Sequence, residues 1–184
     1  MIEQELTYQD LRILSSEIYE AMGYKDSIPD QMVIDETNTL LKRITPLLRP
    51  RFAFFFMEGT LDIEKETLSV QCIHPPTVNP IQDTIPTRSP EQNTFSTQSK
   101  STVFSVGKTI ARQLRGSEAF AFFAATAGTE FEVFQHTLQQ EGDMVKIYIA
   151  DSLGSIIAEK TADCMEVALA EYIREKNWKH TNRY

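Results

Sequence analysis

Hydrophobic residues recur along this chain at two spacings, which indicates both helices and strands. A spacing of three or four residues predicts helices at 7–23, 27–48, 106–115, 129–142 and 144–172. Runs of apolar residues, or strict alternation with polar ones, predict strands at 52–57, 68–72 and 119–125. This order predicts an α+β fold in which helices pack on a small, largely antiparallel twisted sheet.

Individual residues mark the expected ends of the helices. Thr7 is expected to cap the first helix, with Asp10 three residues later as in a variant capping box, and Gly23 to end it. Pro29 suits the first turn of the second helix. Within the long last helix, Gly154 is expected to bend the helix locally.

The first two predicted strands are expected to form a hairpin. The unbroken apolar run at 52–57 indicates a strand covered on both faces, whereas the alternation at 68–72 indicates a half-buried strand. Gly59 and Thr60 are expected at the turn between them.

The segment 74–101 shows no periodicity and holds five of the chain's eight prolines. It is predicted to be a long loop, either a mobile insertion or a segment that packs around the surface. We do not expect a domain boundary there, because the residues on either side would each make an incomplete core. A chain of 184 residues is therefore predicted to form a single domain over 1–184.

Composition limits the class of protein. Apolar residues make up 41% and charged residues 24% of the chain, as in ordinary soluble globular proteins. The net charge of -8 argues against a general nucleic-acid binder, which needs a basic face to displace counterions from phosphates. The longest apolar runs are too short to cross a bilayer and the N-terminus is acidic, so we expect no membrane segment and a cytoplasmic protein.

The cysteines and histidines do not form a metal-binding pattern. Cys72 and Cys164 are too few for a disulfide framework and are predicted to be small core residues. Cys72 with His74 lacks the other two donors of a structural zinc site, and His136 and His180 add no ligand spacing.

Gly107-Lys108-Thr109 looks like the end of a phosphate-binding loop. That motif needs a glycine five positions before the Gly-Lys pair, and Thr102 stands there. We therefore interpret the segment as an ordinary helix start with basic residues on its solvated side.

Three acidic residues, Glu159, Glu166 and Glu171, fall on the last predicted helix. They would face a cationic ligand if one lay alongside the helix, but a solvated acidic face is the favoured interpretation. No residue stands out as a general acid, base or nucleophile.

Seven segments carry a resemblance to a known family. They are 17–24 (Glu-Ile-Tyr-Glu-Ala-Met-Gly-Tyr), 29–30 (Pro-Asp), 107–117, 126–128 (Thr-Ala-Gly), 141–143 (Glu-Gly-Asp), 148–155 (Tyr-Ile-Ala-Asp-Ser-Leu-Gly-Ser) and 162–172. In this order they resemble the activation domain of cobalamin-dependent methionine synthase, in particular the short, free-standing proteins of that superfamily. The resemblance covers most of the chain outside the proline-rich loop.

The resemblance implies a ligand site near the C-terminus. The family's domain binds S-adenosylmethionine, and its most specific motif is an arginine followed by a Pro-Gly-Tyr turn after the long helix. Arg183 and Tyr184 match the start of that motif, where an arginine fork can hold the methionyl carboxylate. The Pro-Gly-Tyr turn is absent, so we expect either a trimmed chain or a natural protein with half of the site.

The function implied by the resemblance is support of another enzyme. S-adenosylmethionine would be presented to a cobalamin on a partner methyltransferase module, with a reductant such as flavodoxin, so that reduced cobalt is remethylated. The protein would supply positioning without being catalytic alone. The alternative is an adaptor or binding protein that retains the fold without binding a methyl donor.

Overall fold

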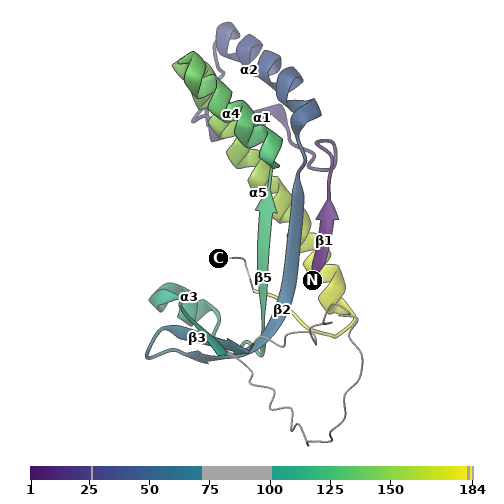
Figure 1. Ribbon diagram of the computed structural model, residues 1–184, viewed down its shortest axis with the longest axis vertical. Helices are drawn as coiled ribbons and strands as arrows, with labels where there is room; N and C mark the ends of the chain where they lie inside the picture. The colour runs from purple at the N-terminus through teal and green to yellow at the C-terminus, as the bar shows by residue number, and fades with distance from the viewer. Residues whose placement is uncertain (26, 72–100, 182, 184) are drawn as a thin grey trace, which may run out of the picture. The chain divides into compact units, whose positions relative to one another are not determined.

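The computed structural model describes residues 1–25, 27–71, 101–181 and 183, and they form an α+β fold as predicted (Figure 1). The strands are β1 (Ile2–Glu5), β2 (Arg51–Asp62), β3 (Thr67–Gln71), β4 (Ser101–Ser105) and β5 (Ala119–Thr126). The α-helices are α1 (Ser15–Ala21), α2 (Gln31–Ile44), α3 (Gly107–Gln113), α4 (Thr129–Glu141) and α5 (Met144–Arg174), and a short 3-10 helix, η1 (Thr45–Leu47), follows α2.

The sheet runs in the order β1-β2-β3-β4, and β5 also pairs with β2. The β1–β2, β2–β3 and β3–β4 pairings are antiparallel. The chain folds as two compact units, one of residues 1–55 and 121–183 and the other of residues 56–120. The single domain over 1–184 stays a prediction, and the proposed loop at 74–101 lies outside the described residues except for Ser101.

The first unit buries its apolar core around α5. The Asp143 carboxylate caps this helix by accepting the backbone N–H groups of Val145 and Lys146 at 3.1 and 3.2 Å. Helices α1, α2 and α4 all pack against α5. The large apolar residues that α5 buries follow helical spacing: Ile149, Leu153, Ile156, Ile157, Met165, Leu169 and Ile173.

Helix α4 meets α5 at Gly154. Phe131, Phe134 and Leu138 of α4 are buried, whereas Val133 is 67% exposed. A Cβ atom on Gly154 would lie 2.5 Å from Cε1 of Phe131, so the glycine allows the two helices to approach closely. The structure thus gives Gly154 a packing role, and the bend stays a prediction.

In the first unit, β2 buries one face, not two as predicted. Phe54 is 1% exposed and meets the Tyr172 ring edge-on at 6.2 Å between centroids. Phe55, the next residue, is 41% exposed and stacks on Phe122 of β5 at 5.6 Å. Successive side chains of a strand point to opposite faces, so an apolar run need not be buried on both.

Helix α1 begins well after the predicted cap. Thr7 does pair with Asp10, whose carboxylate accepts both the backbone N–H and the hydroxyl of Thr7 at 2.7 Å. However, Arg12 has a φ of 50°, a left-handed conformation that interrupts the helix. The helix starts where the Glu17 carboxylate accepts the Leu14 N–H at 2.8 Å.

The second unit contains the predicted hairpin of β2 and β3. Gly59 and Thr60, expected at its turn, lie inside β2 and pair with β3. A Cβ atom on Gly59 would lie 2.6 Å from the Ser69 carbonyl oxygen, so this glycine allows β2 and β3 to pack closely. The turn follows Asp62, whose carboxylate accepts the Lys65 N–H at 3.0 Å.

Strand β4 was not predicted. Val103 and Phe104, just before the helix predicted at 106–115, lie in a strand that pairs with β3, with Phe104 opposite Leu68. All five residues of β4 are exposed. Buried and exposed positions do not alternate along β4, so the strand lacks the burial pattern on which a prediction from sequence depends.

Candidate functional site

Arg183, the predicted ligand arginine, binds to one face of α5. Its Nη1 donates to Oε2 of Glu166 at 2.8 Å. Its Nη2 donates to Oδ1 of Asp163 at 2.7 Å and to Oε2 of Glu159 at 3.3 Å. Positions four and three residues apart share a helix face, so these acids converge on one guanidinium. We call Arg183 with its three carboxylates the Arg183 cluster.

The Arg183 cluster is half-buried and retains excess negative charge. The side chain of Arg183 is 28% exposed, while those of Glu166 and Glu159 are 32% and 74% exposed. Hydrogen bonding to Asp163 raises the pKa of Arg183 further above its already high value, so the guanidinium stays charged. One positive guanidinium thus faces three negative carboxylates. In addition, Nε2 of His180 lies 3.3 Å from Oε1 of Glu166.

Two N–H groups of Arg183 have no protein partner within the part of the chain that the structure describes. A guanidinium carries five N–H donors, and the three bonds to α5 use three of them. The arrangement can therefore offer donors to an anionic group and carboxylates to a cationic one. These are the two kinds of contact that a zwitterionic ligand needs.

The structure brings together only some of the residues singled out in the sequence. Tyr184 lies outside the described residues, and Glu171 is exposed and takes no part in the Arg183 cluster. Asp163 was missed as a candidate. Its spacing of four residues from Glu159 on a predicted helix was the signal available in the sequence.

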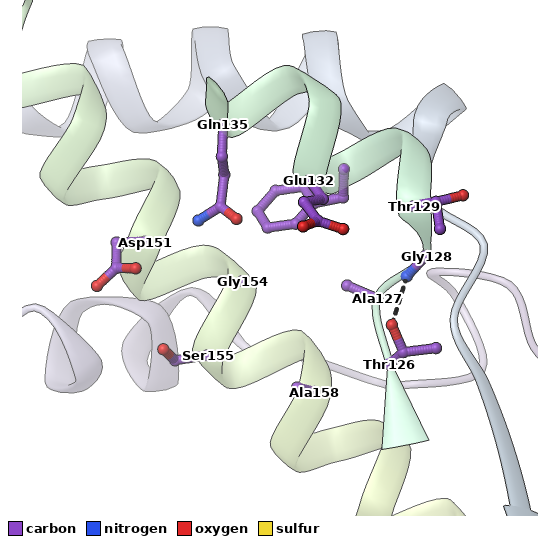
Figure 2. Close-up of a pocket in the computed structure, with 11 residues that line it drawn as sticks. Thr126, Ala127, Gly128, Thr129, Glu132, Gln135, Asp151, Gly154, Ser155 and Ala158 are labelled. Atoms are coloured by element: carbon purple, nitrogen blue, oxygen red, sulfur yellow. Dashed lines mark hydrogen bonds between the residues drawn. The ribbon is translucent and has the colours of Figure 1, made fainter. Parts of the chain in front are cut away.

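A pocket of about 360 Å³ lies elsewhere in the first unit, where β5 ends and α4 meets α5 (Figure 2). Thr126, Ala127 and Gly128, a segment that carried the family resemblance, form one part of its wall. The rest of the lining comes from two helices: Thr129, Phe131, Glu132 and Gln135 of α4, and Asp151, Gly154, Ser155 and Ala158 of α5. No spacing or motif in the sequence groups these residues.

The remaining candidates from the sequence are not assembled into a site. Cys164 is half-buried, and burial raises the pKa of its thiol, which disfavours the reactive thiolate. Cys72 and His74 lie outside the described residues. Among the residues that are described, no group of three or more His, Cys, Asp or Glu is placed to hold a metal ion.

Lys108 and Thr109 fall in the first turn of α3, as expected for an ordinary helix start. None of the helices in the described ranges combines the length and the apolar character needed to span a membrane.

Comparison with known proteins gives one kind of match. No protein-family model matches the chain, and no curated protein matches it. Among solved structures, the crystal structure of the MetH reactivation domain bound to AdoHcy superimposes on 89% of this chain with a TM-score of 0.50 and 14% sequence identity. The two proteins share a fold. This agrees with the fold implied by the resemblance in sequence, and 14% identity extends the likeness no further than the fold.

The chain spans 53% of the MetH reactivation domain in that structure. The shared fold therefore concerns about half of the solved domain, and the activity of the larger protein does not follow from it.

Proposed function

We propose that the protein binds S-adenosylmethionine at the Arg183 cluster and supports reductive remethylation of a cobalamin on a partner methyltransferase module. The observation that carries this proposal is the fold shared with the MetH reactivation domain, whose solved structure holds AdoHcy. AdoHcy is S-adenosylmethionine without the transferred methyl group.

The chemistry of the Arg183 cluster suits such a ligand. The two remaining N–H groups of Arg183, one on Nε and one on Nη1, can each donate a single hydrogen bond to an anionic group such as the methionyl carboxylate. A paired fork to that carboxylate also needs an Nη2 N–H, so the ligand would have to displace Glu159 or Asp163 from Nη2. The excess carboxylates on α5, Glu159 above all because it is the most exposed, suit the ammonium and sulfonium groups. The ligand therefore meets both signs of charge on one helix face.

In this function the chain contributes positioning. A cobalamin on the partner would accept the methyl group, and the protein would hold the donor near it. The net charge of -8 gives the protein a field that favours a basic docking face on the partner. We place the protein in the cytoplasm, where a reductant such as flavodoxin would act.

One observation favours the rival function, an adaptor without methyl-donor binding. The guanidinium of Arg183 already makes three hydrogen bonds to the chain's own carboxylates. If those bonds are purely structural, the cluster fastens the C-terminal segment to α5 and the fold acts only through protein contacts.

Calorimetric titration with S-adenosylmethionine separates the two functions. We expect saturable binding that weakens about tenfold or more in Arg183→Ala, because a charge-assisted pair to the carboxylate is lost. Arg174→Ala is the matched control, since Arg174 is exposed at the end of α5 outside the cluster. No heat and no thermal shift at millimolar ligand would overturn the proposal and leave the adaptor.

A second experiment tests the cobalamin part separately. The protein is mixed with a cobalamin-bearing methyltransferase module, flavodoxin and S-adenosylmethionine, and methylcobalamin is followed by its absorbance. We expect its formation to require this protein and to be reduced in Arg183→Ala. If the ligand binds but methylcobalamin does not form, the remethylation role is wrong while the binding site stands.

A further inference from the structure

The pocket at the end of β5 has no part in the proposed function, yet it has the size of a ligand site. Its volume of about 360 Å³ falls at the lower end of the range for small-molecule pockets. All of its lining residues belong to the first unit, so the pocket does not depend on the placement of the second.

Small residues make the space in this pocket. Ala127 follows β5, and Gly154 and Ala158 lie on the α5 wall, where larger side chains would project into the volume. Gly154 sits against the buried ring of Phe131, which holds the two helix walls in place. The close approach of α4 and α5 at Gly154 therefore forms one side of the pocket.

Besides Thr126 and Thr129, which make hydrogen bonds within the chain, four polar side chains line the pocket from two helices. Glu132 and Gln135 come from α4, and Asp151 and Ser155 come from α5 (Figure 2). Gln135 extends from α4 towards α5 in this view. Across the described ranges of the chain, the structure gives none of these four side chains a hydrogen bond or an ion pair.

The charge of the lining is one-sided. Two of its eleven residues, Glu132 and Asp151, are acids, and no lysine, arginine or histidine is among them. The carboxylates accept hydrogen bonds only, and the Gln135 carbonyl and the Ser155 hydroxyl add further acceptors. Such a lining favours a ligand with positive charge and several N–H donors and disfavours an anion.

We propose that this pocket binds a small aliphatic diamine. One ammonium group would pair with Glu132 on α4 and the other with Asp151 on α5, because the two acids come from different helices. The methylene chain between them would lie against Ala127 and Ala158, where apolar contact adds to the ion pairs. This site is separate from the Arg183 cluster and does not rest on methyl-donor binding.

The test is calorimetric titration of the full chain with putrescine, in low salt and without S-adenosylmethionine. We expect saturable one-to-one binding with a dissociation constant below about 1 mM. Glu132→Gln combined with Asp151→Asn should weaken it about tenfold or more, because both ion pairs are lost. Arg174→Ala, at an exposed position outside both the pocket and the Arg183 cluster, should leave it unchanged.

Two further variants separate a pocket from general attraction to an acidic protein. Glu141→Gln with Glu171→Gln removes the same charge from the same two helices outside the pocket, so binding should persist. Ser155→Phe keeps both carboxylates but fills the pocket from an exposed position, so binding should be lost. Equal weakening in the control pair, no effect of Ser155→Phe, or no saturable binding would overturn the proposal.

Discussion

Gly154 shows how much one residue's environment decides its role. From the sequence, Gly154 was predicted to bend the last helix. The prediction could not take Phe131 into account, because that residue lies on another helix. In the structure the hydrogen atom of Gly154 points where a Cβ would meet the Phe131 ring at 2.5 Å. Helical periodicity identified both residues as parts of helices, but it cannot show which turn of one helix faces which turn of another.

Gly154→Ala is expected to destabilise the protein by about 1 kcal/mol. Overpacking against the buried Phe131 ring costs about 1–3 kcal/mol, and replacing glycine in a helix interior regains up to about 1 kcal/mol. Urea unfolding followed by circular dichroism measures the difference. Phe131→Leu should relieve the clash, so Gly154→Ala should lower the free energy of unfolding by less in that background. A gain in stability from Gly154→Ala alone would contradict the close contact.

At the scale of single elements, sequence signals identified most helices but not always their ends. The Thr7–Asp10 pair forms as predicted, but Arg12 in a left-handed conformation separates it from α1. A cap pattern describes four residues, and it does not report whether the chain after it continues as a helix. Strand β4 was missed for a related reason, since an exposed edge strand carries no burial pattern.

The α2 cap offers a direct test at this scale. The Asp30 carboxylate accepts the Val33 N–H at 3.0 Å, which satisfies one of the free donors at the helix start. Asp30→Ala is expected to lower the free energy of unfolding by about 1 kcal/mol, as measured by thermal or urea denaturation. Asp30→Asn keeps the cap and should be nearly neutral; equal losses in both variants would show that the charge, not the cap, matters.

The whole molecule is expected to lose stability in acid. Hydrogen bonds lower the pKa of several carboxyl groups. Among the donors are the Thr7 hydroxyl for Asp10, the Leu14 N–H for Glu17, the Lys65 N–H for Asp62 and the Lys146 N–H for Asp143. A group whose pKa is lower in the folded state stabilises that state above its unfolded pKa of about 4, and the contribution disappears as the pH falls through the folded pKa.

Urea unfolding at pH 7 and at about pH 3 measures this loss. Asp143→Asn keeps an N-cap on α5 but removes one titrating group, so its stability should fall less steeply in acid. Glu171→Gln is the matched control, because it removes one exposed acid of the same helix that makes no hydrogen bond or ion pair in the described structure. Identical acid profiles for all three proteins would contradict the role of the Asp143 cap.

For the whole molecule, the sequence predicted the α+β fold class and the fold that the chain shares with the MetH reactivation domain, whereas the ligand role of Arg183 and Tyr184 stays a prediction. Periodicity and element order are local properties, and they were enough for the α+β class. The Arg183 cluster required the chain after α5 to return to the middle of that helix, a contact between distant positions. The pocket required three elements to meet, and no spacing in the sequence records such a meeting.

Because Arg183 already occupies the carboxylates of α5, any other cation that binds them must have enough affinity to compete with it. A cation on the same chain is present at its acceptors at an effective concentration of order millimolar, whatever the amount of protein. A free cation that approaches Glu159, Asp163 and Glu166 must therefore compete with a tethered one or bind beside it. A weakly binding free cation cannot displace Arg183 from these carboxylates, whereas a ligand that also engages Arg183 avoids the competition.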